Sequence, residues 1–388
     1  MNLLHITPYY APAYAFGGVP RAVEGIARAL ARRGHMLTVL TTDALSPTER
    51  SREPADTMRD GVRVIRVPNL LARGGLNLST PIGMRRIVRE LIGGVDVIHC
   101  HEFRTIENLI VTPAAARAGV PLVLSPHGTL TYQTGRSAVK SAWDRLFSTA
   151  TARRFDVVIA LTNQERDETR SFWEKFGISN RKIEVIPNGI HPAEFEHLIG
   201  GDAFRRRYGL GDAPVLLFMG RLHARKGVDV LVEAFKRANV GGARLVIAGP
   251  DEGMLPALEP LLDDRIVITG YLAGADRLAA LAAADAFALP ATGEGLSMAA
   301  LEALAAGIPA ILSPGCNLPE AGESGAALIV EPQVAPMADA IRALMTDPAR
   351  RELMGTRGRE LVPSRFTWDV VAEQLEKVYG SFKRSAEY

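Results

Sequence analysis

Cysteine is scarce in this sequence: the chain of 388 residues contains two, Cys100 and Cys316, in unrelated stretches. Two distant thiols do not make a disulfide scaffold, and they lack the paired spacing of a cysteine-based zinc site. This usage is typical of a protein from a reducing compartment.

An excess of charge of either sign is also absent. Lys plus Arg total 45 and Asp plus Glu total 43, which gives a net charge of +2. A nucleic-acid-binding protein neutralises phosphates with a basic surface, and this balance gives no reason to expect one. We therefore predict no nucleic-acid partner.

Long apolar runs are missing as well, although hydrophobic residues make up 47% of the chain. No uninterrupted run approaches the length that crosses a bilayer. The first apolar segment, Asn2 to Ile6, is interrupted by His5 and followed by Pro8, unlike a signal peptide. We expect a cytoplasmic protein.

The chain alternates strand-like β-branched runs with helical runs rich in Ala, Arg, Glu and Leu, which predicts parallel sheets with crossover helices. Its length calls for two domains. The predicted strands are 3–6, 36–41, 62–67, 95–99, 121–125, 157–161 and 182–186, then 215–219, 244–248, 265–269, 285–289, 310–313 and 327–330. The polar segment 188–212 between the two series, with its Asn188-Gly-Ile-His-Pro192 start, is predicted to be a linker. The first strand is not followed by G-x-G-x-x-G, which argues against a dinucleotide-dependent oxidoreductase.

The stretch from Pro290 to Glu320 organises the chain. It reads as the end of a strand, a loop, a helix that begins at Ser297, and the next strand. The first amides of a helix have no internal partners, and the peptide dipoles add partial positive charge there. We therefore predict that the backbone N–H groups of four residues bind a phosphate. These residues are Gly295, Leu296, Ser297 and Met298.

Two carboxylates flank this phosphate site, Glu294 before the helix and Glu302 within it. Eight helical steps would separate them by roughly 12 Å along the axis. That distance suits the two polyol ends of a sugar nucleotide, a ribose and a hexose, with the diphosphate between them. A solvated helix face is the alternative reading of two glutamates alone.

Glu294-x7-Glu302, followed by Ala-Leu-Ala-Ala-Gly-Ile-Pro and by the pair Pro319 and Glu320, resembles the donor-site signature of retaining GT-B glycosyltransferases of family GT4. The resemblance extends over essentially the whole chain. It implies an α/β fold of two Rossmann-like, doubly wound domains that face a cleft, where the active site lies. Residues 1–190 would bind the acceptor and 191–365 the nucleotide sugar. An amphipathic C-terminal helix within 366–388 would cross back to the first domain.

The segment Gly220-Arg-Leu-His-Ala-Arg-Lys-Gly227 resembles the family's G-R-L-x-x-x-K-G motif. A planar guanidinium and a flexible ammonium suit a diphosphate leaving group, on which negative charge grows as the glycosidic bond breaks. This assigns Arg221 and Lys226 to the diphosphate, against the alternative of a solvated basic turn. Arg225 is a further cation without a predicted role.

In the first half, Gly17 and Gly18 match the family's donor loop, where glycines allow close backbone approach to a ligand. A plain turn is the alternative. His127, in Ser125-Pro-His-Gly128, matches the histidine that lies near the donor sugar; the alternative is a histidine satisfied within the core. By resemblance, Gly249, Tyr271 and Leu272 border the nucleobase, mainly through backbone groups and apolar contact.

A metal ion is not predicted. His99 and His101 share one face of a strand and, with Glu102, could suggest a metal site, but the resemblance puts this edge beside the cleft. The sequence also contains no D-x-D triplet, which GT-A transferases commonly use to hold a divalent ion. No cofactor is expected either.

Five basic residues decorate a predicted helix that also contains Trp143, Leu146 and Phe147. They are Arg136, Lys140, Arg145, Arg153 and Arg154. One reading is a core helix with a solvated basic face. The other is a surface attracted to anionic lipids, as in GT4 enzymes that act on lipid-linked acceptors.

Together these features predict a retaining hexosyltransferase that uses a nucleotide-diphosphate sugar and a saccharide or lipid-linked saccharide acceptor. The family's front-face mechanism needs no protein nucleophile. The alternatives are a GT-B nucleotide-sugar epimerase, a sugar phosphorylase, and a sugar-nucleotide-binding protein without turnover. The acceptor would be recognised by loops 44–60 and 70–81, in which no motif is readable.

Overall fold

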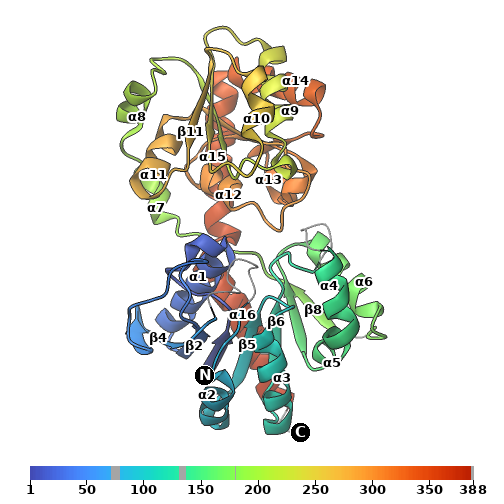
Figure 1. The fold of residues 1–388 in the computed structure, drawn as a ribbon. Coiled ribbons are helices and arrows are strands. Elements are labelled where there is room, and N and C mark those ends of the chain that lie inside the picture. Colours follow the sequence, from blue (N-terminus) through green and yellow to red (C-terminus); the bar gives the residue numbers. More distant parts are fainter. Residues whose placement is uncertain (71–78, 131–136, 180, 386–388) are drawn as a thin grey trace. The chain divides into compact units, whose positions relative to one another are not determined.

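The computed structural model describes residues 1–70, 79–130, 137–179 and 181–385. The chain divides into two compact units (Figure 1). The first comprises Met1–Gly189 and Trp368–Tyr388, and the second comprises Ile190–Thr367. These boundaries lie within two residues of the division made from the sequence.

The strands of the first unit are β1 (Asn2–Ile6), β2 (Met36–Thr42), β3 (Asp56–Arg59), β4 (Val62–Val67), β5 (Val97–His101), β6 (Leu122–Ser125), β7 (Val157–Ala160) and β8 (Lys182–Val185). They form one sheet in the order β3-β4-β2-β1-β5-β6-β7-β8. Neighbouring strands are parallel except β3 and β4, which are antiparallel. The helices are α1 (Val19–Arg32), α2 (Met84–Leu91), α3 (Ile106–Ala118), α4 (Ser137–Trp143), α5 (Thr149–Ala152), α6 (Asn163–Glu174) and α16 (Trp368–Ser385).

The strands of the second unit are β9 (Val215–Met219), β10 (Arg244–Ala248), β11 (Ile266–Gly270), β12 (Ala286–Leu289), β13 (Ala310–Leu312) and β14 (Ala327–Ile329). They form an all-parallel sheet in the order β11-β10-β9-β12-β13-β14. The helices are α7 (Ala193–Glu196), α8 (Gly201–Arg207), α9 (Val228–Ala238), α10 (Leu255–Leu258), α11 (Gly274–Ala283), α12 (Met298–Ala305), α13 (Pro319–Glu323), α14 (Val334–Met345) and α15 (Pro348–Arg365).

Both sheets reverse their strand order beside their first strand. In the first sheet β1 lies between β2 and β5, and in the second β9 lies between β10 and β12. Ligands of open α/β sheets bind beyond the carboxyl ends of the strands at such a switch point. The loops after β1 and β5, and those after β9 and β12, are therefore the places to look for a site.

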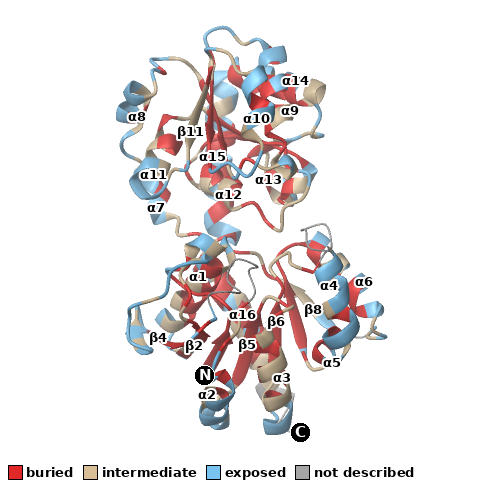
Figure 2. Cartoon of the chain, viewed as in Figure 1, coloured by how far each residue is buried: buried red, intermediate tan, exposed pale blue. Residues whose placement is uncertain are grey.

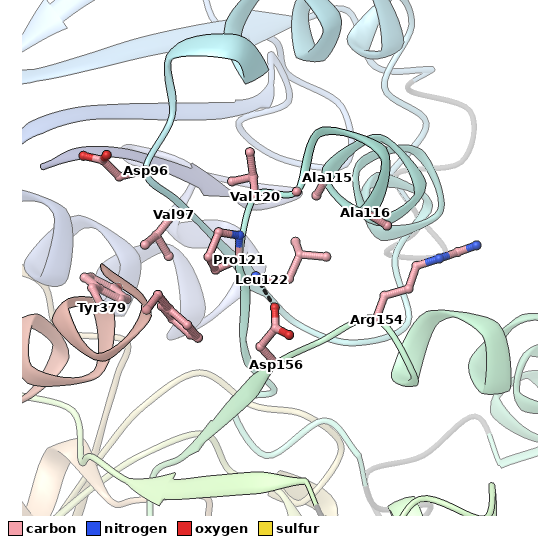
Figure 3. A pocket seen from close by; sticks show the side chains of 12 residues that line it. Asp96, Val97, Ala115, Ala116, Val120, Pro121, Leu122, Arg154, Asp156 and Tyr379 are labelled. Atoms are coloured by element: carbon pink, nitrogen blue, oxygen red, sulfur yellow. Dashed lines mark hydrogen bonds between the residues drawn. The ribbon is translucent and has the colours of Figure 1, made fainter. Parts of the chain in front are cut away.

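At the amino-terminal edges of the sheets, an aspartate directly before one strand repeatedly binds the first amide of a neighbouring strand. Asp96 Oδ2 accepts a hydrogen bond from the Asn2 amide at 2.7 Å, and Asp156 Oδ2 accepts one from the Leu122 amide at 2.8 Å (Figure 3). In the second unit, Asp285 Oδ2 accepts one from the Val215 amide at 2.8 Å. Each satisfies an amide that the first residue of a neighbouring strand would otherwise leave unpaired.

The helix α16 packs against the first unit, as the sequence predicts. Its buried residues Trp368, Val371, Leu375 and Tyr379 join one core cluster with residues of α1 and the sheet. Figure 2 shows the buried strands of this sheet in red. Trp368 lies directly on Gly25 of α1, where a Cβ atom would be 2.2 Å from Trp368 Cε2. Only glycine permits this approach of the indole to the helix.

Three sequence predictions about the fold are wrong. The segment predicted as a loop, 44–60, contains the edge strand β3, whose residues are exposed or half-buried. The segment predicted as a linker contains α7 and α8, and Arg205 of α8 binds Asp285 at 3.0 Å. Strand β5 begins two residues later than predicted: Val95 is the C-cap of a 3-10 helix, Ile92–Gly94, and the side chain of Asp96 binds the Asn2 amide before the strand starts. The predicted acceptor loop 70–81 falls mainly on residues outside the described ranges.

Candidate functional site

Two predicted residues meet at the switch point of the second sheet. Lys226 follows β9 and ends a short 3-10 helix, Ala224–Lys226, while Glu294 follows the neighbouring strand β12. The Lys226 Nζ atom donates to Glu294 Oε1 at 2.7 Å, and the two side chains are 15% and 17% exposed. The structure thus joins the two motifs in a partly shielded ion pair.

The loop that carries Glu294 is held on both sides. The Arg225 guanidinium donates to the Gly293 carbonyl at 2.5 Å, and the Thr292 amide donates to the Arg225 carbonyl at 2.8 Å. Asn317 Nδ2 donates to the carbonyl of Glu294 itself at 2.6 Å. Arg225, which has no role predicted from sequence, therefore positions the loop, and this fixes the backbone of Glu294.

Helix α12 begins as predicted. Ser297 is its N-cap, and its Oγ atom accepts a hydrogen bond from the Ala300 amide at 3.3 Å. The amide of Glu294 donates a hydrogen bond to the Gly315 carbonyl at 2.8 Å. Within the described ranges no backbone hydrogen bond uses the amides of Gly295, Leu296 or Met298, and amides at the start of a helix favour an anion.

Arg221 leaves β9 beside Lys226 but has a different partner. Its Nη1 atom donates to both carboxylate oxygens of Glu252 at 2.8 Å, and its side chain is 61% exposed. The loop after β10 lies against this segment, and a Cβ atom at Gly249 would be 1.7 Å from the Gly220 carbonyl oxygen. Glycine at 249 therefore lets the two loops touch, although Glu252 was not anticipated as a partner.

Glu302 has a cationic partner that the sequence did not reveal. Its carboxylate forms an ion pair with Arg277 of α11, which also binds Glu194 at 3.3 Å and lies over the ring of Phe195. The partner belongs to a helix without a recognisable motif. A helical glutamate that is 21% exposed and paired in this way is not a freely solvated side chain.

Tyr271 and Leu272 directly follow β11. Tyr271 is 64% exposed, so its ring is available to a ligand, and Leu272 is half-buried. The Gly249 amide donates to the carbonyl of Gly270 at 2.8 Å, which links the loops after β10 and β11. Their contact with a nucleobase stays a prediction.

In the first unit, four imidazoles gather at the carboxyl ends of neighbouring strands. His5 of β1 pairs in register with His99 of β5, while His101 ends β5 and His127 follows β6. His101 Nδ1 lies 3.0 Å from His127 Nε2, and His101 Nε2 lies 3.1 Å from His5 Nδ1. The sequence analysis singled out His127, His99 and His101, but it missed His5.

His127 is fixed by its backbone as well as by its ring. It has a left-handed φ of 56°, which is uncommon for a residue with a side chain and often marks a functional site. The next amide, of Gly128, donates to Glu165 Oε1 at 2.5 Å, and Glu165 Oε2 accepts from Leu161 at 2.7 Å. Burial raises the pKa of Glu165 to about 7 and lowers that of His127 to about 4.

The histidines also have the composition of a metal site. Potential ligand atoms of His5, His99 and His101 lie within 4.8 Å of one another. However, His99 Nδ1 lies 2.6 Å from the hydroxyl of Tyr379, and His99 Nε2 lies 2.8 Å from Ser125 Oγ. A metal would have to replace hydrogen bonds that are already formed, so the arrangement is that of a hydrogen-bonded network.

Gly17 and Gly18 lie directly before α1, with Gly18 as its N-cap. They do not follow β1 directly, because a 3-10 helix, Tyr14–Phe16, intervenes. Apart from the adjoining residues, no atom of the described ranges lies within 4 Å of a Cβ built at either position. The space a ligand would need is therefore open there.

The helical segment 137–152 has one buried side, from which Ala152 joins the core of the first unit, and one exposed side. Leu146 and Phe147 are 70% and 39% exposed, and Arg145 is exposed between Asp144 and them. Its inner side is fixed by Asp144, which accepts from Arg104 at 2.8 Å. Arg136 lies outside the described residues. Among the helices the structure describes, none is long and apolar enough to cross a bilayer.

A separate cavity of about 560 Å³ lies at the amino-terminal edge of the first sheet, where Val97, Leu122 and Asp156 line it together with Tyr379 (Figure 3). None of the residues predicted to bind the donor lines it, but Arg154 of the predicted basic surface does. Val97 and Leu122 begin β5 and β6, so the cavity lies at the opposite end of these strands from His101, and Tyr379 connects it to His99 through the contact of its hydroxyl.

Comparisons with known proteins agree over both units. Residues 16–194 match the model for Glycosyltransferase Family 4, and residues 213–347 match that for Glycosyl transferases group 1. A glycogen synthase of Mycobacterium tuberculosis is 30% identical, over 99% of this chain and 95% of that protein. A GDP-mannose-dependent alpha-(1-6)-phosphatidylinositol monomannoside mannosyltransferase of the same organism is 30% identical over 91% of each chain. The structure of Anabaena HepE in complex with UDP-glucose has a TM-score of 0.74 at 18% identity, over 98% of this chain and 100% of that chain.

Proposed function

Because the chain belongs to glycosyltransferase family 4 and has the GT-B fold, we propose that it transfers a hexosyl group from a nucleotide-diphosphate sugar, with retention at the anomeric carbon. The acceptor is a saccharide or a lipid-linked saccharide, which suits a role in polysaccharide or glycolipid synthesis. One relative named above is GDP-mannose-dependent and one similar structure contains UDP-glucose, so the proposal fixes neither the base nor the hexose.

The observation that carries this proposal is the ion pair of Lys226 and Glu294 next to the start of α12. It brings an ammonium, a carboxylate and a set of helix amides together at a switch point. A diphosphate needs the ammonium and the amides, and a sugar hydroxyl needs the carboxylate. The three groups therefore match the two chemical parts of one donor.

In the proposed complex, the diphosphate lies against the amides of Gly295 to Met298 and is contacted by Lys226 and Arg221. Arg221 would exchange Glu252 for a phosphate, which its exposed position allows. Glu294 binds hexose hydroxyls and Glu302 binds the ribose. Tyr271 and Leu272 border the base together with Gly249, and the remaining predicted donor contacts, Gly17, Gly18 and His127, belong to the first unit.

The reaction is a front-face displacement. The bond between the anomeric carbon and the diphosphate oxygen breaks, and the acceptor oxygen forms its bond to the same face of that carbon. The acceptor's proton passes to the departing phosphate oxygen. Charge that develops on the diphosphate is stabilised by Lys226, Arg221 and the helix amides, so neither a protein nucleophile nor a metal ion is required.

The exposed helix of the first unit supports a peripheral membrane location at the cytoplasmic face. Val139, Leu146 and Phe147 are 54%, 70% and 39% exposed, and Arg145 and Arg153 are exposed beside them. Apolar side chains that enter the headgroup region and arginines that attract anionic lipids are the two parts of an interfacial helix. A lipid-linked acceptor would be held at the same surface.

Product analysis tests the function. A panel of sugar nucleotides is first screened for a rise in melting temperature, since a ligand of the native state stabilises it. Each donor that binds is then incubated with saccharide acceptors, and the product is analysed by NMR. We expect a nucleoside diphosphate and a glycoside with the donor's anomeric configuration. An inverted glycoside would refute retention, an epimerised donor would indicate an epimerase, and donor binding without any product would indicate a binding protein.

A further inference from the structure

Three of the buried imidazoles form a continuous chain. His101 contacts His5 through Nε2, at 3.1 Å from His5 Nδ1, and His127 through Nδ1, at 3.0 Å from His127 Nε2. The outer atoms of the chain, His5 Nε2 and His127 Nδ1, are buried and meet no partner among the described residues. The chain therefore ends in one unpaired nitrogen at each side.

Burial keeps these rings neutral near pH 7. It lowers the pKa of His5 to about 3, that of His127 to about 4 and that of His101 well below its usual value. A neutral imidazole has one N–H donor and one acceptor nitrogen. His101 must therefore donate to one neighbour and accept from the other.

Two arrangements of protons satisfy both hydrogen bonds. In one, His101 donates to His5, and the unpaired N–H lies on His5 Nε2. In the other, His5 donates to His101, which donates to His127 Nε2, and the unpaired N–H lies on His127 Nδ1. Each arrangement leaves one buried N–H unpaired. The arrangement that places this N–H where it costs less free energy is favoured.

An unpaired N–H is costly where nothing can reach it. His5 is 0% exposed within a central strand, whereas His127 is half-buried in a loop at the carboxyl edge of the sheet, where ligands of this fold class bind. Both outer nitrogens are covered in this structure, but that of His127 belongs to a partly exposed residue of an edge loop, so a ligand that binds at the carboxyl edge can approach its donor, whereas the central strand encloses that of His5. The second arrangement is therefore favoured.

We propose that His5 and His101 are positioning residues that keep the proton of His127 on Nδ1, so that His127 offers an N–H to an oxygen atom of the bound sugar. The sugar as ligand rests on the proposed function, whereas the position of the proton does not. The contacts of Glu165 with the Gly128 and Leu161 amides hold the backbone of this loop, so the ring is oriented from both sides.

His99 belongs to the same cluster but not to the chain. Its ring is stacked on that of His101, with centroids 4.4 Å apart, and its nitrogens pair with Tyr379 and Ser125. The variant His99→Phe removes an equally buried imidazole and keeps an aromatic ring against His101. It is the matched control for variants of His101.

The test is the tautomer of His127, measured by two-bond proton–nitrogen NMR correlations on protein labelled with ¹⁵N-histidine and assigned with the variant His127→Phe. In the wild type and in His99→Phe, we expect Nδ1 to carry the proton and Nε2 to be unprotonated. His101→Leu removes the donor to Nε2, so the Nε2-protonated form should appear. His101→Asn places an amide N–H near the position of Nδ1, and we expect it to restore the wild-type tautomer.

Activity gives a second readout. His101→Leu should lower kcat/KM about tenfold or more, the size expected for a lost substrate hydrogen bond, while His101→Asn stays within about threefold of the wild type. Melting temperatures identify variants that fail to fold. A wild-type His127 protonated on Nε2, or an unchanged tautomer in His101→Leu, would overturn the proposal even in an active transferase. Absence of any glycoside product together with the expected tautomers would instead reject the proposed function and leave the positioning role supported.

Discussion

Lys226 Nζ lies 2.7 Å from Glu294 Oε1 at the boundary between the loops that follow β9 and β12. While no sugar nucleotide is bound, the ammonium and the carboxylate neutralise each other's charge at a partly shielded position. In the proposed complex the diphosphate becomes the partner of Lys226, and Glu294 becomes available to the hydroxyls of the hexose. The pair would therefore exchange its internal contact for two contacts with one ligand.

This relationship predicts coupled effects of mutation. Glu294→Ala should mainly lower kcat, because the carboxylate lies beside the ring that changes in the transition state. Lys226→Met should lower kcat/KM. A charged hydrogen bond contributes about 1.5–3 kcal/mol, so each variant should lose at least roughly tenfold.

A double-mutant cycle measures the coupling between the two residues. Each single variant leaves a partly buried charge unpaired, so the double variant should lose less than the product of the two single losses. Steady-state kinetics of the four proteins, with melting temperatures as the folding control, give the answer. Losses that simply multiply would show that the ion pair has no part in the reaction.

Glu302 should have a different signature from Glu294. It binds the ribose in the proposed complex, which changes little during the reaction, so Glu302→Ala should raise the donor KM at least tenfold with kcat nearly unchanged. Arg277→Met keeps the carboxylate but removes the cation that holds it, and we expect a smaller rise in KM. A fall in kcat equal to the rise in KM for Glu302→Ala would place the donor elsewhere on α12.

The features that the sequence predicts well are those encoded within one segment. Ser297 as an N-cap, the alternation of strands and helices, and the apolar face of α16 all depend on neighbouring residues. The contact of Lys226 with Glu294 depends instead on the pairing of β12 with β9, and no local sequence pattern predicts which strands are neighbours. The sequence therefore identifies both residues without identifying their partnership.

Residues without a motif were missed for the same reason. His5 and His101 are 96 positions apart, and His99 and Tyr379 are 280 apart, so only the folded sheet and the returning helix bring them together. Arg277 is an ordinary helical arginine until α11 is placed beside α12. The edge strand β3 and the helices α7 and α8 were misread because polar and Gly- or Pro-containing segments resemble loops.

Activity should not depend on a divalent metal ion. The diphosphate has Lys226, Arg221 and the amides of α12 to stabilise its charge, so chelation should leave turnover unchanged. The measurement is kcat of the purified enzyme in excess EDTA, compared with the same enzyme supplied with magnesium or manganese. Complete loss in EDTA that either ion restores would refute this expectation.

The exposed helix of the first unit should bind anionic vesicles. Each basic residue near such a surface contributes about 1 kcal/mol, so replacing Arg136, Lys140 and Arg145 by Gln should weaken binding by roughly a hundredfold. Activity on a soluble acceptor should stay unchanged. Sedimentation with phosphatidylglycerol vesicles measures the binding.

The matched control replaces Arg206, Arg237 and Arg350 by Gln, which removes the same charge from exposed positions of the second unit. If this control weakens vesicle binding as much as the helix variant does, net charge and not the helix is responsible. Unchanged sedimentation of the helix variant would mean that these residues form an ordinary solvated surface and do not bind lipid.

Because Trp368 packs on Gly25, we predict that Gly25→Ala lowers the free energy of unfolding of the wild type but raises that of the Trp368→Ala variant. Trp368 is 5% exposed, so Trp368→Ala should lower the free energy of unfolding by about 3–5 kcal/mol, the usual cost of removing a buried aromatic side chain. In the wild type, Gly25→Ala should also destabilise, since its Cβ would lie 2.2 Å from Trp368 Cε2.

Trp368→Ala removes the three atoms that lie nearest to a Cβ at position 25, all of which belong to the indole. Gly25→Ala should then stabilise the protein by up to about 1 kcal/mol, because alanine favours a helix over glycine. Gly380 of α16 is the matched control: apart from the helix's own backbone, no atom of the described residues lies within 4 Å of a Cβ built there, so Gly380→Ala should stabilise in both backgrounds. Urea unfolding followed by circular dichroism measures all of these variants. A destabilising Gly25→Ala in the Trp368→Ala background would mean that a contact other than the indole requires glycine in α1.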